Sequence, residues 1–110
     1  MLQMSGRIKS WQSFLGLAQR AGKVISGEET VIRSIRDQKA KAVILSADAS
    51  LRTTKTIENK CRYYQIPLLT VPDRAELGQA IGQPFRVIVA VVDSGFAEVL
   101  IERLGSSTRG

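Results

Sequence analysis

Few residues in this sequence could perform catalysis. The chain has no histidine and one cysteine, so no histidine base activates a nucleophile, and the usual zinc ligand sets and an internal disulfide are excluded. Cys61 falls among residues of helical character and is expected to be a buried small hydrophobe. Four carboxylates, Glu28, Glu29, Asp48 and Asp93, fall at or near expected helix N-termini, where the helix dipole accounts for them. The sequence therefore predicts no catalytic residues, no cofactor and no metal site.

A phosphate-binding P-loop is also excluded. Five residues separate Gly16 from Gly22, where the motif requires four, and Val24 occupies the Ser/Thr position. The segment also lies in a helix that precedes a strand, whereas a P-loop follows a strand. Gly22 is instead expected to end a helix, because glycine is the preferred residue just past a helix end.

Three other segments carry groups suited to RNA. In residues 23–33 (KVISGEETVIR), Gly27 leads from a strand into a helix N-terminus, whose backbone N–H groups can contact phosphates or base edges; taken alone, this is more often just a capped helix. Residues 48–55 (DASLRTTK) and 82–86 (GQPFR) add cationic, hydroxyl and aromatic groups. The candidate RNA-binding residues are Lys23, Gly27, Glu28, Glu29, Thr30, Arg33, Asp48, Ala49, Ser50, Arg52, Pro84, Phe85 and Arg86.

The charge of the chain is unevenly distributed. Its 16 basic and 10 acidic residues give a net charge of +6. Residues 1–62 hold 12 Lys/Arg against 5 Asp/Glu, whereas residues 63–110 hold 4 against 5. A basic half suits a polyanionic partner, because neutralised phosphates release counterions. On charge alone, a solvated basic surface that only confers solubility fits equally well.

Alternating helical and strand patterns predict the fold. Helices are expected at 10–21, from 27 to about 39, at about 50–64, from Asp73 and after Asp93, with strands at 23–26, 42–47, 66–71 and 87–92. Residues 42–47 form an apolar run broken only by Ser46, and this strand is expected at the centre of the sheet. In helix 10–21 we expect Ser10 at the N-cap and a buried face of Trp11, Phe14, Leu17, Ala18 and Ala21. The pattern predicts a three-layer α/β/α sandwich with a four-stranded mixed sheet.

The length of 110 residues suits a single domain, with residues 1–8 and 105–110 expected to be flexible. No apolar run approaches a membrane span, and the N-terminus lacks the apolar stretch of a secretory signal. We therefore expect a soluble, cytoplasmic, monomeric protein with no membrane partner.

The spaced motifs LAxRAGK, SGEE, DAS with TxK, CxYYxIP, ELGxAIG and VDSGF, within about residues 14–97, closely resemble the bacterial YlxQ-like branch of the seven-Ae/thirty-e ribosomal protein superfamily. Relatives in that superfamily have an α/β/α fold and bind kink-turns, sharply bent RNA elements with tandem sheared G·A pairs. They read these pairs with a Gly-x-Asn-Glu-x-x-Lys stretch. The resemblance places Gly27 at the glycine, Glu29 at the Asn, Thr30 at the Glu and Arg33 at the Lys. Glu29 and Thr30 thus depart from the family pattern in chemistry, whereas Arg33 keeps the positive charge with different geometry.

Together these features predict a non-catalytic, ribosomal or ribosome-associated protein that recognises a structured, kink-turn-like RNA element, with ribosomal RNA as the expected partner. Ribosomal proteins are further possible partners. The alternative is a protein-interaction module that docks on a ribosomal or RNA-processing protein, with the basic surface serving solubility. A salt-sensitive complex with RNA favours the first interpretation, and a partner retained after nuclease treatment favours the second.

Overall fold

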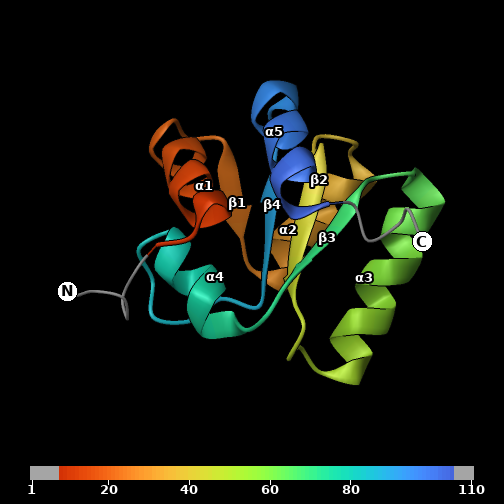
Figure 1. The fold of residues 1–110 in the computed structure, drawn as a ribbon. Coiled ribbons are helices and arrows are strands. Elements are labelled where there is room, and N and C mark those ends of the chain that lie inside the picture. The colour runs from red at the N-terminus through yellow and green to blue at the C-terminus, as the bar shows by residue number, and fades with distance from the viewer. Residues whose placement is uncertain (1–7, 106–110) are drawn as a thin grey trace.

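Helices and strands alternate along the chain in a computed structural model that describes residues 8–105 (Figure 1). The elements are α1 (Ser10–Arg20), β1 (Val24–Ser26), α2 (Glu28–Arg36), β2 (Ala42–Ser46), α3 (Leu51–Tyr64), β3 (Leu68–Val71), α4 (Arg74–Ala80), β4 (Ile88–Val91) and α5 (Ser94–Leu104). Of the ends expected to be flexible, residues 1–7 and 106–110 lie outside the described part. Between residues 8 and 105, no helix has the length and apolar character needed to cross a bilayer.

The strands form one mixed sheet in the order β1-β4-β2-β3. β4 runs antiparallel to both of its neighbours, pairing Ile88 with Leu45 of β2 and Val89 with Ser26 of β1. β2 and β3 run parallel, with Val43 opposite Leu68. Every residue of β2 is buried, as expected for a strand inside a sheet that is covered on both faces. The predicted central position of this strand is confirmed, and β4 shares it.

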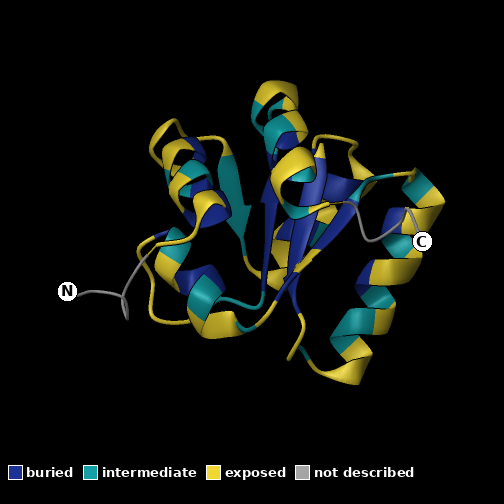
Figure 2. Cartoon of the chain, in the orientation of Figure 1, coloured by how far each residue is buried: buried dark blue, intermediate teal, exposed yellow. Residues whose placement is uncertain are grey.

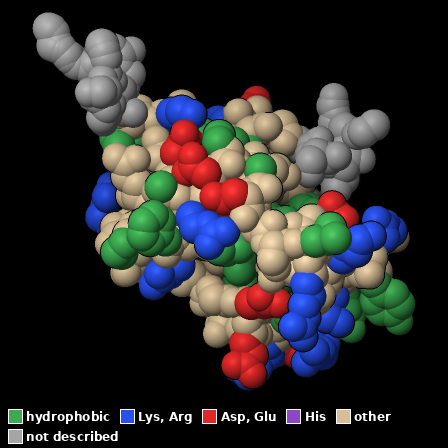
Figure 3. All heavy atoms as spheres, turned by 90° about the horizontal axis from the view of Figure 1, so that it is seen from below, with side chains coloured by type: hydrophobic (Ala, Val, Ile, Leu, Met, Phe, Trp, Pro, Cys, Tyr) green, Lys and Arg blue, Asp and Glu red, His purple; other side chains and the backbone are tan. Residues whose placement is uncertain are grey.

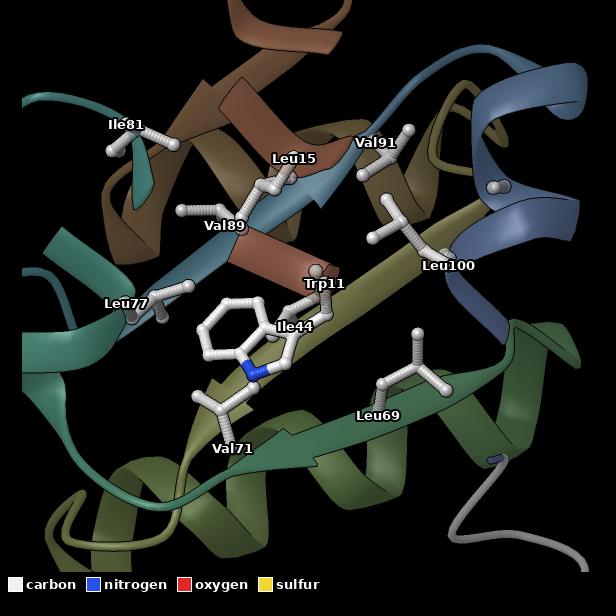
Figure 4. Close-up of a cluster of buried hydrophobic side chains, with 12 residues drawn as sticks. Trp11, Leu15, Ile44, Leu69, Val71, Leu77, Ile81, Val89, Val91 and Leu100 are labelled. Atoms are coloured by element: carbon white, nitrogen blue, oxygen red, sulfur yellow. The ribbon is translucent and has the colours of Figure 1, made fainter. Parts of the chain in front are cut away.

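Helices cover both faces of the sheet, so the predicted three-layer sandwich is confirmed (Figures 1 and 2). Side chains alternate along β2, with Ile44 packed under α1, α4 and α5 and Val43 packed under α2 and α3. Figure 4 shows the first cluster, in which Trp11 and Leu15 of α1 lie against strand residues. The core is built mainly from aliphatic side chains, as the low aromatic content predicts.

The buried face of α1 differs from the one expected. Leu17 and Ala21 are exposed, and Leu15 is buried in their place. The apolar pattern misleads because a polar residue, Gln12, occupies a buried position. Its side chain accepts a hydrogen bond from the N–H of Lys9 at 2.8 Å and donates to a carbonyl of α4 at 3.0 Å, which satisfies it there. The N-cap is Lys9 and the helix begins at Ser10, one residue from the expected cap.

The strand directions bring several loops to one end of the sheet. Since β1, β2 and β3 run one way and β4 the other, the carboxyl ends of the first three meet the amino end of β4. This edge carries the connections after β1, β2 and β3 and the connection before β4. We call it the loop end, and it comprises residues 27–30, 47–52, 72–74 and 84–87.

Candidate nucleic-acid interface

The start of α2 presents backbone N–H groups at the loop end. Gly27 is its N-cap, with φ +100° and ψ 136°, and no side chain caps the helix. The Gly27 N–H donates to the Ile88 carbonyl at 3.4 Å, which fixes this turn against β4. The N–H groups of the first turn lack intrahelical acceptors and carry the positive end of the helix dipole. This turn is therefore suited to a phosphate or a base edge that accepts hydrogen bonds.

The start of α3 lies beside the start of α2. Both helices begin at the loop end, run away from it on the same face of the sheet and pack against each other. Ser50 caps α3, its hydroxyl accepting from the Thr53 N–H at 3.1 Å. Thr53 Oγ1 in turn donates to Glu28 Oε1 at 3.1 Å, which turns that carboxylate toward α3. Two helix N-termini thus lie side by side, with Glu28 held between them.

Asp48 and Arg74 tie the loop after β2 to the start of α4. Arg74 Nη2 donates to the Asp48 carbonyl at 2.7 Å, its backbone N–H donates to Asp48 Oδ2 at 3.3 Å, and its Nε lies 3.4 Å from the same oxygen. The nearby Ser46 hydroxyl, followed by Arg74, holds the pKa of the Asp48 carboxyl below its usual value, against the opposing effect of desolvation. Ser46 Oγ is buried and makes no hydrogen bond of regular geometry, so it acts on Asp48 as a nearby dipole. Asp48 therefore holds the loop after β2 against the start of α4.

The third loop reaches the first two through Arg86. Its backbone N–H donates to the Arg74 carbonyl at 3.1 Å, and its Nε approaches Ser26 Oγ at 3.4 Å. A further bond from Nη1 to the Phe85 carbonyl, at 2.7 Å, folds the guanidinium back over the loop. The Phe85 ring is 60% exposed, and Pro84 beside it is exposed as well. Phe85 is therefore available to stack on an unpaired base.

Replacing Gly78 with alanine is expected to displace this loop. A Cβ at Gly78 would lie 2.7 Å from the Gln83 carbonyl oxygen and 2.8 Å from backbone atoms of Phe85. Because those atoms are backbone, Gly78→Ala should lower the free energy of unfolding by about 1–3 kcal/mol, measured by urea denaturation. Gly95→Ala is the matched control, since a Cβ there closely approaches only a side-chain oxygen of Asp93. Equal stability of Gly78→Ala and wild type would contradict this prediction, because it would mean that residues 83–85 shift at no cost in free energy.

Most candidate residues from the sequence come together at the loop end, and Figure 3 views the molecule from that side. They include both exposed and partly exposed residues: Gly27, Glu28, Glu29, Thr30, Asp48, Ala49, Ser50, Arg52, Pro84, Phe85 and Arg86. Arg33 is exposed in the second turn of α2, farther from the edge. Lys23 does not join them. Its carbonyl accepts from the Val92 N–H at 2.9 Å, which places it at the opposite end of the sheet.

Three residues at or beside the loop end were not expected from the sequence. Arg74 and Thr53 hold the loops through Asp48 and Glu28. Leu51, the first residue of α3, is 72% exposed and offers an apolar surface beside Ser50. The sequence held a signal for Leu51, because it stands off the helix face that the buried Ile57 and Cys61 define four residues apart.

The expected burial of Cys61 is confirmed. The residue is 2% exposed, and desolvation raises the pKa of its thiol to about 12. The thiol is therefore protonated and unreactive near neutral pH. Within residues 8–105, no three acidic, histidine or cysteine side chains gather to form a metal site.

The fold and its loop-lined end define a class of α/β/α proteins, and comparison with known proteins gives the family. The family model described as "Ribosomal protein L7Ae/L30e/S12e/Gadd45 family" matches residues 9–101. The chain therefore belongs to this family, and the resemblance drawn from its motifs is confirmed.

Individual relatives agree with the family. The chain is 52% identical over 101 residues to RNA-binding protein YlxQ of Bacillus subtilis strain 168, covering 92% of this chain and 99% of that protein. It is 32% identical over 94 residues to the large ribosomal subunit protein eL30 of Eremothecium gossypii, covering 78% and 84%.

Solved structures share the fold. A protein of unknown function from Bacillus halodurans C superimposes with a TM-score of 0.85 at 42% identity, covering 86% of this chain and 96% of that one. The Giardia lamblia 15.5kD RNA binding protein superimposes with a TM-score of 0.75 at 16% identity, covering 86% and 81%. At that low identity, the second match supports the fold alone.

Proposed function

We propose that this protein is a non-catalytic RNA-binding protein that recognises structured RNA with its loop end. The observation that carries the proposal is the convergence of three sequence-distant segments, residues 27–30, 47–52 and 84–86, at one edge of the sheet. The name of the Bacillus subtilis relative, an RNA-binding protein 52% identical to this chain, supports it.

The loop end offers each kind of contact that RNA recognition uses. Backbone N–H groups at the start of α2 suit phosphates or base edges, and the Arg33 guanidinium can reach a guanine edge or a phosphate. Phe85 and Leu51 present apolar surface to unstacked bases. Glu29 only accepts hydrogen bonds, so it must face base amino groups or solvent, because phosphates would repel it.

The finer proposal is that the RNA is a kink-turn-like element of ribosomal RNA, bound in the cytoplasm. The family match and the eL30 relative, a large ribosomal subunit protein, support this choice. Glu29 and Thr30 stand where the kink-turn binders carry Asn and Glu. Ionised Glu29 cannot donate to a base as Asn does, so we expect weak binding to a standard kink-turn.

Restoring the family pair is expected to strengthen that binding. Glu29→Asn combined with Thr30→Glu leaves the net charge unaltered, so a gain reflects geometry and hydrogen bonding more than bulk electrostatics. We expect kink-turn affinity to rise by at least about 1 kcal/mol, the low end for one good base contact. The measurement is a titration of both proteins against a kink-turn RNA and a copy whose G·A pairs are replaced by Watson–Crick pairs.

The outcomes distinguish RNA binding in general from recognition of a kink-turn. Tight, selective binding by wild type would contradict the expected effect of Glu29 and Thr30. If neither protein prefers the kink-turn but both bind ribosomal RNA, the target is another kind of structured RNA. If neither binds RNA and a protein partner survives nuclease treatment, the RNA-binding proposal is wrong.

A further inference from the structure

The excess positive charge of the described residues lies in one layer of the sandwich. The segments that form the α2–α3 layer, residues 28–41 and 51–64, hold eight Lys/Arg and four Asp/Glu. The remaining residues between 8 and 105 hold six of each and are neutral overall. The excess charge of the basic half of the sequence therefore lies on one face of the folded protein, and that face begins at the loop end.

The outer side of α3 carries this charge in a row. Arg52, Lys55 and Arg62 are all exposed, and their spacings of three and seven residues place them on one side of the helix, opposite the buried Ile57. Asn59 lies in the same row, and its Oδ1 accepts from Arg62 Nη1 at 3.2 Å. We call Arg52, Lys55 and Arg62 the α3 row. It runs roughly 15 Å along the helix from the loop end, at about 1.5 Å per residue.

The α3 row has no anionic partner within residues 8–105. Glu58 is the only carboxylate of α3, and no ion pair joins it to a cation of the row. Among the exposed cations elsewhere in the described part, Lys9 lies 3.1 Å from Glu76, and Arg103 bonds to Ser10 and covers the Phe14 ring. Arg20 and Lys23 form no ion pair with another described residue, but they stand alone on the far side of the molecule and not in a row.

Glu58 lies three residues after Lys55 and four before Arg62, so three cations face one carboxylate on this side of α3. The excess positive charge costs self-repulsion, which an external polyanion would relieve.

We infer that RNA seated on the loop end continues along the outer face of α3, where the α3 row contacts its phosphate backbone. This inference rests on the proposed function and adds a second contact surface to it. At about 3.4 Å of rise per nucleotide in one strand, the row spans about four nucleotides. Tyr63 lies near the far end of the row, 79% exposed and held edge-on by the Tyr64 ring with centroids 4.8 Å apart. Its exposed ring is available to stack on the last of these bases.

The test compares two double variants that remove the same charge from opposite parts of the molecule. Lys55→Ala/Arg62→Ala shortens the α3 row and leaves Arg52, at the loop end, in place. Arg20→Ala/Lys23→Ala removes two exposed cations on the side away from the loop end. The probe is purified bacterial ribosomal RNA cut to fragments of about 50 nucleotides, titrated by filter binding at several salt concentrations. A circular dichroism spectrum of each variant serves as the control for correct folding.

Loss of two phosphate contacts should flatten the log–log salt dependence of Lys55→Ala/Arg62→Ala by about 1.4 and lower its affinity about tenfold near 0.1 M salt. The control should change less than about twofold. Equal losses in both variants would reduce the effect to net charge and overturn the inference. The inference is also overturned if Lys55→Ala/Arg62→Ala binds RNA as tightly as wild type.

The inference and the proposed function fail in different ways. If the α3 variant binds like wild type while a loop-end variant, Gly27→Ala, loses affinity, the loop end remains the RNA site and the α3 row does not. If wild type does not bind ribosomal RNA, both are wrong. Anionic phospholipid vesicles that bind wild type but not the α3 variant, with RNA binding unaltered, would assign the row to a membrane surface instead.

Discussion

Raising the salt concentration from about 50 to about 200 mM is expected to weaken RNA binding at least a hundredfold. Helices α2 and α3 themselves carry five exposed cations, Arg33, Arg36, Arg52, Lys55 and Arg62. If each neutralises one phosphate, the log–log slope is about −3.5 for single-stranded RNA, and a fourfold rise in salt lowers affinity by roughly two orders of magnitude.

The measurement is a titration of wild type with ribosomal RNA fragments at four salt concentrations. A far-ultraviolet circular dichroism spectrum at each concentration serves as the control, since it separates a change in binding from a change in fold. Affinity that stays within threefold across this range would mean that few phosphates are contacted. The basic face would then serve solubility.

Gly27→Ala is expected to produce the largest loss from a single substitution. Gly27 adopts φ +100° and ψ 136°, a conformation that only glycine adopts without strain, so the variant should lose about 1–3 kcal/mol of stability or shift the turn. A Cβ there would meet no atom within 4 Å, so the penalty is one of backbone conformation. A shifted turn moves the first N–H groups of α2, and RNA affinity should fall at least tenfold, measured by titration on folded protein.

Gly22→Ala is the matched control for this prediction. Gly22 also has a positive φ, +75°, and a Cβ there would also meet nothing within 4 Å, but it lies at the end of the sheet remote from the loop end. We expect Gly22→Ala to be destabilised as well and to keep its RNA affinity. Equal loss of affinity in both folded variants would trace the effect to stability and remove the start of α2 from the site.

Much of the fold could be predicted from local pattern. The apolar run of β2 and the Asp73 and Asp93 caps mark their elements directly, and the structure has Asp73 and Asp93 accepting hydrogen bonds at the starts of α4 and α5. The face of α1 could not be predicted in the same way. Its burial depends on Gln12, whose hydrogen bonds reach α4, more than sixty residues away in the sequence.

The candidate site shows the same limit. Gly27 and Ser50 were recognisable as helix starts because their chemistry is local. Lys23 stands four residues before Gly27, but β1 carries the chain to the other end of the sheet between them, and only the pairing with β4 reveals this. The bonds from Arg74 to Asp48 join segments 26 residues apart and leave no local signal.

The most direct test of the loop end as an RNA site is a map of backbone amide shifts by nuclear magnetic resonance during titration with ribosomal RNA fragments. Residues 27–30, 47–52 and 84–86 should shift together at low RNA ratios, with the outer face of α3 following the same saturation curve. The amide of Lys23 and those of α1 and α5 should stay in place. Shifts confined to α1 and α5, with the loop end unmoved, would contradict the account.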